Sequence, residues 1–406
     1  MRLRIHHGAV QVGGNCIELE SGGRSLLLDL GLPLDSPPIM PSVRGLMAPD
    51  PNLLGVVLSH PHLDHYGLLP SARPDLSVWL GAGAKRLLDA AAPFTAGAVL
   101  PQTIATYQDR EAFDVGPFRI TPYLMDHSAF DAHALLVEAG GKRLFYTGDF
   151  RGHGRKAAVF ERFLAAPPAD IDALLMEGTT ISRDEPSPSE TDVETQTAGL
   201  MQNHAGIMLL CFAGQNIDRF VTFLRASMKA GRTFVIDPYL AGLVTALDIK
   251  GLPDVNAHPN IRVYLPKAQK RMIVRDQRFD LVEPYRSRRI FMEEIQANPG
   301  RFAMMFRTSM VSDFVGVELA GGGLIYSLWP GYLDRDRTDL RAWARDAKLS
   351  FQVVHSSGHA SRADLQRMAH ALQAKRLIPI HTERPDQYAA LYPKVERAAN
   401  GQWVEV

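Results

Sequence analysis

The segment from Leu58 to His65 concentrates residues that can bind metal ions. It contains His60, His62, Asp64 and His65 within six positions. Imidazole nitrogens and carboxylate oxygens are common zinc ligands. In an extended loop His60 and His62 point the same way, whereas Asp64 and His65 turn toward a neighbouring point. The spacing therefore predicts a loop that contributes to two adjacent metal sites, because packing alone would hardly gather these four residues.

Two polar residues further along the chain could complete such sites. His127 follows the apolar run 118–123, and Asp149 follows the run 143–145. A carboxylate such as Asp149 can bridge two metal ions about 3.5–4 Å apart. Singly, a histidine in a loop or an aspartate after a glycine is more often a surface or turn residue. Their value as candidate ligands depends on their combination with the His60–His65 loop.

Short strands must position these residues, because each follows an apolar run. Leu53–Leu58 reads as a buried strand that leads into the histidine loop. Glycine turns separate further pairs of strands, and one segment has helical spacing. The predicted hairpins are 16–20 with 25–30 and 134–138 with 142–147, and the predicted helix is 85–92. The pattern favours an α/β order with helices outside the sheets.

A polar, proline-rich connector at 182–189 marks a change of organisation and ends in a good helix N-cap. Beyond it, strand and helix alternate, which predicts βαβ units and a parallel sheet. The predicted elements are a helix at 191–203, a strand at 207–212, a helix at 217–230 and a strand at 233–237, then a strand at 351–355, a helix at 362–373 and strands at 377–380 and 403–406. We expect a second domain of a different α/β kind.

Composition narrows the class of protein. The 406 residues are 46% hydrophobic, enough for more than one core. Lys plus Arg equal Asp plus Glu at 44 each, so any polyanion site must come from a local patch. Cys16 and Cys211 are the only cysteines, which argues against a disulfide framework and favours the cytoplasm. The N-terminus has no signal-like apolar region, and no stretch approaches the ~20 apolar residues of a membrane span.

The order of candidate ligands resembles that of the metallo-β-lactamase fold. A His-x-His-x-Asp-His loop is followed by a lone histidine, His127, and then by Asp149. Asp29-Leu30-Gly31 ends the second strand as the first motif of that fold does, where the aspartate supports the metal loop. The resemblance implies an αββα sandwich. Because many activities use this fold, it does not by itself define the function.

Three later segments look like motifs A, B and C of the β-CASP branch of this fold. They hold Glu177 in 174–179, His359 in 356–361 and His381 in 378–383. This branch contains ribonuclease J and the cleavage-and-polyadenylation endonucleases. Its hallmark is a domain inserted into the metallo-β-lactamase domain. The resemblance therefore implies that residues 1–190 form the first part of the metallo-β-lactamase domain, 191–360 the β-CASP domain and 361–406 the closing part of the metallo-β-lactamase domain. The segments 147–151 and 357–361 point most toward ribonuclease J.

The resemblance implies a role for each motif residue. One zinc ion is expected on His60, His62, His127 and Asp149, and a second on Asp64, His65, Asp149 and His381, with Mn²⁺ or Mg²⁺ as alternatives. Asp64 would orient or deprotonate the attacking water. His359 would face the scissile phosphate as a charge-stabilising donor or an acid, with Ser357 and Gly358 as nearby donors. Glu177 would accept a hydrogen bond from a ligand imidazole.

A basic stretch at 262–289 could bind a polyanion. It carries nine Lys or Arg against three acidic residues, a net charge of +6 in a neutral chain. Tyr264, Phe279 and Tyr285 are interleaved, and aromatic side chains among cations suit a single strand of nucleic acid. An ordinary solvated surface explains such a charge run equally well.

The expected function is hydrolysis of phosphodiester bonds in single-stranded RNA, as exonuclease, endonuclease or both. A nuclease for single-stranded DNA, a hydrolase for a small ester or thioester, and a binding protein without turnover remain alternatives. Two departures from ribonuclease J limit the comparison. Glu177-Gly178-Thr179 stands where Asp-Ser-Thr is common, and only about 25 residues follow His381, which suggests a short form without the usual C-terminal domain. The oligomeric state stays open.

Overall fold

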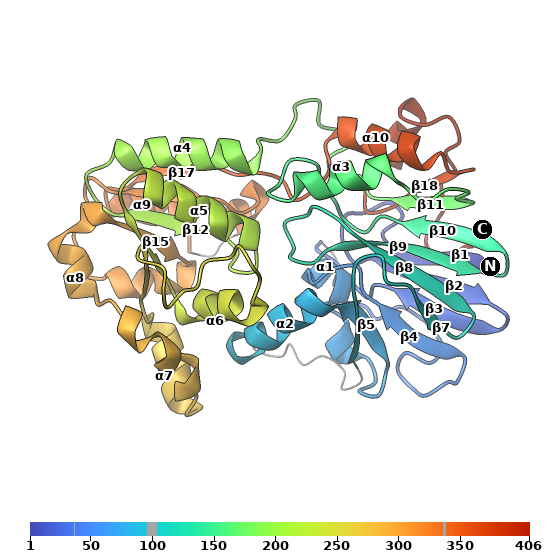
Figure 1. The fold of residues 1–406 in the computed structure, drawn as a ribbon, viewed down its shortest axis with the longest axis horizontal. Coiled ribbons are helices and arrows are strands. Elements are labelled where there is room, and N and C mark those ends of the chain that lie inside the picture. The colour runs from blue at the N-terminus through green and yellow to red at the C-terminus, as the bar shows by residue number, and fades with distance from the viewer. Residues whose placement is uncertain (36, 96–103, 336–337) are drawn as a thin grey trace. The chain divides into compact units, whose positions relative to one another are not determined.

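The computed structural model describes residues 1–35, 37–95, 104–335 and 338–406. The chain divides into two compact units (Figure 1). Unit 1 consists of residues 1–88, 95–187 and 358–406, and unit 2 of residues 89–94 and 188–357. Unit 2 is therefore almost entirely an insertion into the sequence of unit 1.

Two sheets form the centre of unit 1 among the described residues. The first has the order β19-β1-β2-β3-β4-β5-β6, with β1 Arg2–His7, β2 Cys16–Ser21, β3 Arg24–Leu28, β4 Leu53–Val57, β5 Val78–Gly81, β6 Ile104–Tyr107 and β19 Trp403–Glu405. The second has the order β18-β11-β10-β9-β8-β7, with β7 Phe113–Val115, β8 Phe118–Leu124, β9 His133–Ala139, β10 Lys142–Tyr146, β11 Ala173–Met176 and β18 Leu377–Pro379. The helices are α1 Leu63–Tyr66, α2 from Ala82 to Ala91, α3 Ala157–Ala165 and α10 Arg362–Leu372.

The sheets face each other across an apolar core, as alternating strand residues require. Leu19 and Leu28 of the first sheet and Ile120 and Val137 of the second belong to one buried cluster. A second cluster joins the outer face of the second sheet to α3 and α10, and a third joins the outer face of the first sheet to α2. Unit 1 is thus the expected αββα sandwich, and Figure 1 shows α3 and α10 over their sheet.

Local sequence explains the hairpins and the return of the chain. Gly22 and Gly23 both have positive φ, +58° and +76°, as a two-residue turn between β2 and β3 requires. After the insertion, β18 pairs in parallel with β11, so that Leu377 lies opposite Leu174. The segments that hold Glu177 and His381 therefore follow neighbouring strands, although the whole of unit 2 separates them in sequence.

Unit 2 contains a parallel sheet in the described part of the chain, as the strand and helix alternation predicts. Its order is β14-β13-β15-β12-β16-β17, with β12 Met208–Cys211, β13 Thr233–Ile236, β14 Ile261–Val263, β15 Phe302–Phe306, β16 Gly323–Tyr326 and β17 Ser350–Val353. Its helices are α4 Glu190–Gln202, α5 Ile217–Lys229, α6 Pro238–Leu247, α7 Lys267–Arg275, α8 Met292–Ala297 and α9 Leu340–Asp346. Ser189 and Asp192 form a capping box that begins α4, where the N-cap is predicted.

Candidate metal centre

The candidate ligands all follow the ends of strands in unit 1. Because several strands end at the same edge of the sandwich, residues far apart in sequence can meet there. The loop after β4 leads to His60, His62, Asp64 and His65, β8 leads to His127, β10 to Asp149, β11 to Glu177 and β18 to His381. The candidate ligands are thus held by the ends of buried strands.

The first group of possible ligands consists of three histidines. One nitrogen of each of His60, His62 and His127 lies within 4.8 Å of the others. His127 Nε2 lies 3.1 Å from His62 Nδ1. His127 Nδ1 donates to the carbonyl oxygen of Gly358 across 2.5 Å, which leaves Nε2 as the ligand atom. Three imidazoles can therefore converge on one ion.

The second group combines two carboxylates and two imidazoles, from Asp64, His65, Asp149 and His381, again within 4.8 Å. His65 Nε2 lies 3.2 Å from Asp149 Oδ2. His381 Nε2 lies 3.7 Å from Asp64 Oδ2, and the rings of His65 and His381 stack with centroids 5.2 Å apart. This donor set suits zinc or another divalent cation.

Asp149 lies between the two groups. Its Oδ2 atom is 3.7 Å from His60 Nε2 and 4.0 Å from His127 Nε2, in addition to its contact with His65. One carboxylate thus reaches both sets of imidazoles, which is the placement expected of a ligand shared by two ions. The structure brings together all seven residues predicted as ligands.

The burial of these ligand atoms tests whether they fit a metal ion. His60, His65, Asp149 and His381 are at most 2% exposed. In the described part of the chain, Nε2 of His60, His65 and His381 and both carboxylate oxygens of Asp149 make no hydrogen bond of good geometry. Leaving a buried polar group unsatisfied costs about 1–3 kcal/mol, and more when it is charged. Metal coordination would satisfy all of these atoms, so the residues fit divalent ions.

Asp29 orients the metal loop, as the resemblance implies. Its carboxylate accepts hydrogen bonds from His65 Nδ1 at 2.7 Å, from the backbone N–H and hydroxyl of Ser59 at 2.7 and 2.8 Å, and from the hydroxyl of Tyr146 at 2.6 Å. Because a carboxylate only accepts, Nδ1 of His65 must carry a proton and Nε2 must face the metal position.

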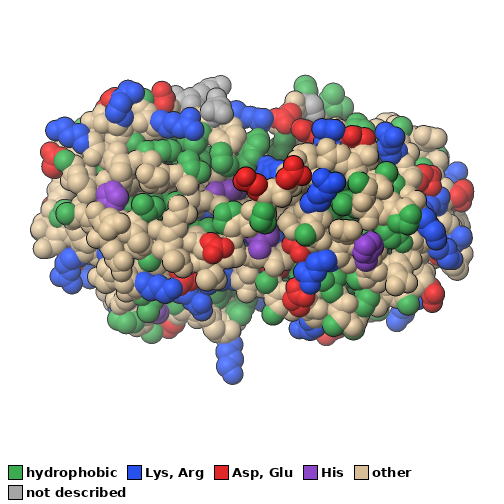
Figure 2. All heavy atoms as spheres, turned by 90° about the horizontal axis from the view of Figure 1, so that it is seen from above, with side chains coloured by type: hydrophobic (Ala, Val, Ile, Leu, Met, Phe, Trp, Pro, Cys, Tyr) green, Lys and Arg blue, Asp and Glu red, His purple; other side chains and the backbone are tan. Residues whose placement is uncertain are grey.

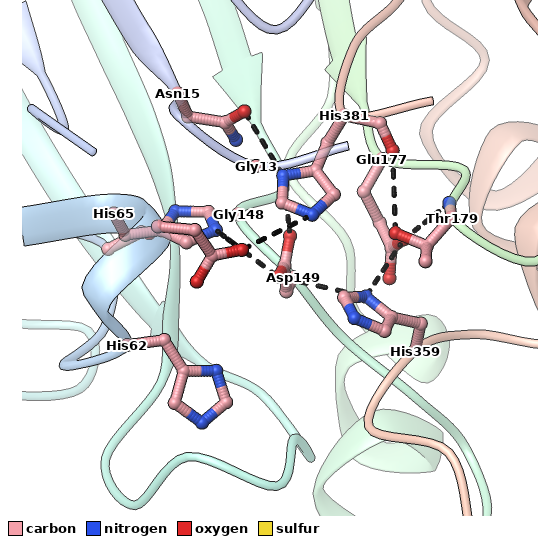
Figure 3. Close-up of polar contacts among 12 residues, drawn as sticks. Gly13, Asn15, His62, His65, Gly148, Asp149, Glu177, Thr179, His359 and His381 are labelled. Carbon is pink, nitrogen blue, oxygen red and sulfur yellow. Dashed lines mark hydrogen bonds and ion pairs between the residues drawn. The ribbon is translucent and has the colours of Figure 1, made fainter. Parts of the chain in front are cut away.

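Asn15 and Tyr146 connect Asp29 to a second candidate ligand, His381, which lies near the C-terminal end of the sequence. The sequence analysis did not identify either residue. Asn15 Oδ1 accepts from His381 Nδ1 at 3.1 Å (Figure 3). Asn15 Nδ2 donates to Tyr146 Oη at 3.1 Å. A continuous chain of hydrogen bonds therefore runs from His381 through Asn15, Tyr146 and Asp29 to His65. Its only sequence signals are the position of Asn15 after Gly13-Gly14 and that of Tyr146 before Gly148-Asp149.

Electrostatics keeps the first group of imidazoles neutral. Burial, together with neighbouring imidazoles, holds the pKa of His60 and of His127 well below the usual value. Burial likewise lowers the pKa of His62 to about 4. Neutral imidazoles present the lone pairs that a metal requires.

Carboxylates dominate the second group. Burial disfavours ionisation of Asp149, yet the imidazoles of His381 and His65 hold its pKa well below the usual value. Burial also disfavours protonation of His65, but Asp149 and Asp29 raise its pKa well above the usual value. The same negative potential would stabilise a bound cation.

His359 lies beside this centre and is held by two acidic side chains. Its Nδ1 atom is 3.3 Å from Glu177 Oε2 and 3.7 Å from Asp149 Oδ2 (Figure 3). Burial opposes its protonation, but Glu177 and Asp149 raise the pKa of His359 to about 9. Its side chain is 22% exposed, so it can reach a substrate from beside the ligands.

Glu177 contacts a different imidazole from the one expected. The sequence predicts a hydrogen bond to a ligand imidazole, whereas the contact observed is with His359. The carboxylate also accepts from the backbone N–H groups of Phe150, Thr179 and Ala360 at 3.1–3.3 Å. These donors direct the side chain toward the 358–360 segment and away from the histidine loop.

Gly358 packs closely against Ser128 and His127. A Cβ atom at this position would meet the hydroxyl of Ser128 and would lie 3.2 Å from His127 Cε1. Glycine therefore allows the main chain to accept the His127 hydrogen bond. Ser357, the other predicted donor, is 7% exposed and lies at the end of unit 2.

The basic stretch keeps its charge but loses most of its stacking surface. Tyr264 and Tyr285 are buried, at 8% and 6% exposure, and donate to Asp313 and Thr245, so the predicted stacking on bases is wrong for these two residues. Phe279 is exposed. Three acidic residues pair locally with arginines, in the pairs Arg275–Asp276, Arg278–Asp280 and Arg286–Glu283.

Three of the six remaining cations lie on α7, and Arg262, Arg288 and Arg289 lie outside it. Lys267, Lys270 and Arg271 are exposed and follow helical i, i+3, i+4 spacing, so they share one face. Elsewhere, cationic and anionic side chains are interspersed over the face drawn in Figure 2, in keeping with the net charge of zero. Among the described residues, no helix has the length and apolarity to cross a bilayer.

Two segments match known domain families. Residues 36–214 match the beta-lactamase superfamily domain, and residues 346–391 match the Zn-dependent metallo-hydrolase RNA specificity domain. These matches cover the histidine loop, His127, Asp149 and Glu177 in the first case, and His359 and His381 in the second.

Similar proteins include several nucleases. The chain is 23% identical to ribonuclease J of Sinorhizobium meliloti, over 94% of this chain and 69% of that protein, and 26% identical to ribonuclease J of Mycobacterium tuberculosis, over 57% and 43%. It is 28% identical to cleavage and polyadenylation specificity factor 73 of Drosophila melanogaster over 42% of this chain and 27% of that protein. A crystal structure of a protein of unknown function from Enterococcus faecalis V583 shares the fold, with a TM-score of 0.80, 20% identity and 99% coverage of both chains.

Proposed function

Because the chain is a ribonuclease J-like member of the β-CASP branch of the metallo-β-lactamase fold, we propose that it is a two-zinc nuclease that hydrolyses phosphodiester bonds of single-stranded RNA. The observation that carries the proposal is the convergence of seven potential ligands in two neighbouring groups. Asp149 of the second group lies within 4.0 Å of His60 and His127 of the first, and His359 lies beside it. The nuclease relatives and the matched RNA specificity domain support RNA as the substrate.

The proposed ligand sets follow the two groups. His60, His62 and His127 would hold one ion, and Asp64, His65 and His381 the other, with Asp149 shared. Bound zinc would supply an acidic water and neutralise charge on a phosphate oxygen. The chain's own contribution is to orient the ligand imidazoles through Asp29, Asn15 and Gly358, in a buried site.

Asp64 is the proposed base. It is partly exposed, at 15% for its side chain, whereas Asp149 is buried. A partly exposed carboxylate beside the second ligand group can accept a proton from a water molecule and pass it to solvent. Asp149, surrounded by imidazoles, is better placed to hold metal.

His359 is the proposed donor to the phosphate or the leaving oxygen. Three backbone N–H groups keep the carboxylate of Glu177 in place, and this carboxylate stabilises positive charge on His359. Glu177 is therefore a positioning residue in this proposal. Ser357 and Gly358 would add donors near the substrate, as the motif resemblance implies.

Cationic residues of α7 would contribute to binding the strand. Lys267, Lys270 and Arg271 lie exposed on α7, and neutralising phosphates needs no base-specific contact. With Tyr264 and Tyr285 buried, this segment supplies charge more than base stacking.

The test is metal content together with cleavage of 5′-monophosphate RNA, 5′-hydroxyl RNA and single-stranded DNA. We expect two zinc ions per chain, metal-dependent cleavage of RNA, and loss of cleavage in Asp64→Ala. Mononucleotide products would indicate an exonuclease, and internal fragments an endonuclease. Metal binding with RNA affinity but no cleavage of any substrate would refute the proposal.

A further inference from the structure

Arg219 lies at the point where the chain enters and leaves unit 2. The long continuous part of unit 2 begins at Pro188 and ends at Ser357. Glu190, two residues after the entry, and Ser356, one residue before the exit, both contact the guanidinium of Arg219. The side chain of Arg219 is fully buried. One residue of α5 therefore touches both crossing segments.

The contact with the entry segment is a bidentate ion pair. Arg219 Nε and Nη2 donate to the two carboxylate oxygens of Glu190 at 3.1 and 2.9 Å. Thr222 also donates to this carboxylate at 2.7 Å. Glu190 is 1% exposed, so the pair is shielded from solvent on both sides. Bidentate geometry fixes the orientation of the two partners as well as their distance.

The contacts with the exit segment run through main-chain carbonyl groups. Arg219 Nη1 donates to the carbonyl oxygen of Ser327 at 3.0 Å, and Nη2 lies 3.5 Å from that of Ser356. The hydroxyl of Ser327 in turn donates to the carbonyl oxygen of Val354, and His355 Nδ1 contacts Ser327 O at 3.2 Å. The 354–356 segment is thus held by a buried network centred on Arg219.

Only Ser357 and Gly358 separate this network from His359. On the far side, Gly358 accepts a hydrogen bond from His127, and the N–H group of Ala360 donates to Glu177 at 3.3 Å. The segment with His359 is therefore tied down at both ends, to Arg219 before it and to the metal-centre elements after it. Freeing one end would increase the freedom of the imidazole between them.

We infer that Arg219 and Glu190 form a clamp that holds the two chain crossings together and thereby positions His359. Arg219 touches no substrate in this account and is a positioning residue. The structural part of the inference concerns the 354–361 segment alone, whereas its consequence for catalysis rests on the proposed function.

Arg232 offers a matched control within unit 2. It is also a buried arginine, 5% exposed, and it donates to the carbonyl oxygens of Met201, His204, Gly206 and Phe302. It has the same side chain and comparable burial, and it contacts four main-chain carbonyl groups where Arg219 contacts two. Among the described residues, none of its hydrogen-bond partners lies in the crossing segments. Arg232→Lys should therefore disturb unit 2 about as much as Arg219→Lys without loosening the exit segment.

The experiment compares Arg219→Lys, Glu190→Gln and Arg232→Lys in the full chain. Amide hydrogen exchange of residues 354–361 should become about tenfold faster or more in the first two variants and stay unchanged in Arg232→Lys, since exchange reports local opening. Unchanged exchange in both clamp variants, or equal acceleration in Arg232→Lys, would overturn the inference. If Arg219→Lys does not fold, Glu190→Gln decides, because it keeps the side-chain size.

Turnover gives the second measurement. With metal content unchanged, kcat on RNA should fall on the order of ten- to hundredfold in the clamp variants, with a smaller change in KM, since a misplaced catalytic group costs rate more than binding. An Arg232→Lys enzyme should keep its kcat. Equal kcat in all three variants would overturn the catalytic consequence. A wild-type protein without nuclease activity would refute the proposed function, while the exchange result would still decide on the clamp.

Discussion

Tyr146 donates a hydrogen bond to Asp29 across 2.6 Å, and both side chains are fully buried. This bond lies in the middle of the chain that joins His381, through Asn15, to His65. Two imidazoles from opposite ends of the sequence are therefore oriented by one set of neutral and acidic groups. Disturbing the middle of the chain should loosen both.

Replacing Tyr146 by phenylalanine should weaken metal binding at the second ligand group. Loss of an outer-shell hydrogen bond typically lowers metal affinity by about 10–100-fold, and the ring itself would still fill its place in the core. Competition with a chelator of known affinity would measure the change. Tyr392→Phe is the control. The hydroxyl of Tyr392 also donates a buried hydrogen bond, but its acceptor is the carbonyl oxygen of Ala374, which is not a candidate ligand. Equal zinc affinity in the two variants would contradict the prediction.

Removing metal should lower the thermal stability of the protein. Binding to the folded state alone adds about 2.7 kcal/mol at a ligand concentration 100 times Kd, and 1 kcal/mol shifts Tm by roughly 2–4 °C in a domain of 150–250 residues. We expect calorimetry to show a Tm about 5–10 °C higher with zinc than after chelation. In Asp149→Asn, which loses the shared carboxylate, the difference should shrink. A wild-type Tm that does not respond to zinc would count against the centre.

The loss of kcat in a His359 variant should depend on whether the leaving group of the substrate needs a proton. If its imidazole protonates the leaving oxygen, His359→Gln should lower kcat on RNA by about 10²–10⁴-fold, the usual contribution of a general acid. The same variant should hydrolyse a 4-nitrophenyl phosphodiester almost as fast as the wild type, because nitrophenolate needs no proton to leave. A large, equal loss on both substrates would instead indicate charge stabilisation.

Charge on α7 should appear in the salt dependence of RNA binding. Each phosphate contact on a single strand contributes about 0.7 to the slope of log K against log salt. Lys267→Ala/Lys270→Ala/Arg271→Ala should therefore make the slope less steep by about 2.

A second triple variant provides the control for charge. Arg275→Ala/Arg278→Ala/Arg286→Ala removes the same number of cations, but each of these already has an acidic partner. Binding titrations at several salt concentrations would compare the two. If both variants change the slope equally, the face of α7 has no special role.

Much of the fold is predictable because its local signals agree. The apolar run before His60, the Gly22-Gly23 turn and the Ser189 cap each specify an element without help from distant residues. The gathering of candidate ligands is also foreseeable, since each follows a strand end and strands of a sandwich end at common edges. The αββα sandwich and the parallel sheet of unit 2 are found as predicted.

The rest depends on contacts between residues far apart in sequence. Asn15 and Tyr146 have ordinary residue types. Asn15 supports a candidate ligand because the segment after β18 brings His381 beside it, and Tyr146 acts through its bonds with Asn15 and Asp29. Tyr264 looks suited to stacking, but burial against the core of unit 2 decides its use. Glu177 contacts His359 because backbone donors orient its carboxylate, which no spacing in the sequence reveals.

The pairing of β18 with β11 has a consequence for biosynthesis. His381 is translated only after the whole of unit 2, so a growing chain holds six of the seven proposed ligands and lacks the last. For a ribonuclease, this order delays assembly of the second metal group until the ribosome has nearly passed the coding region for both units.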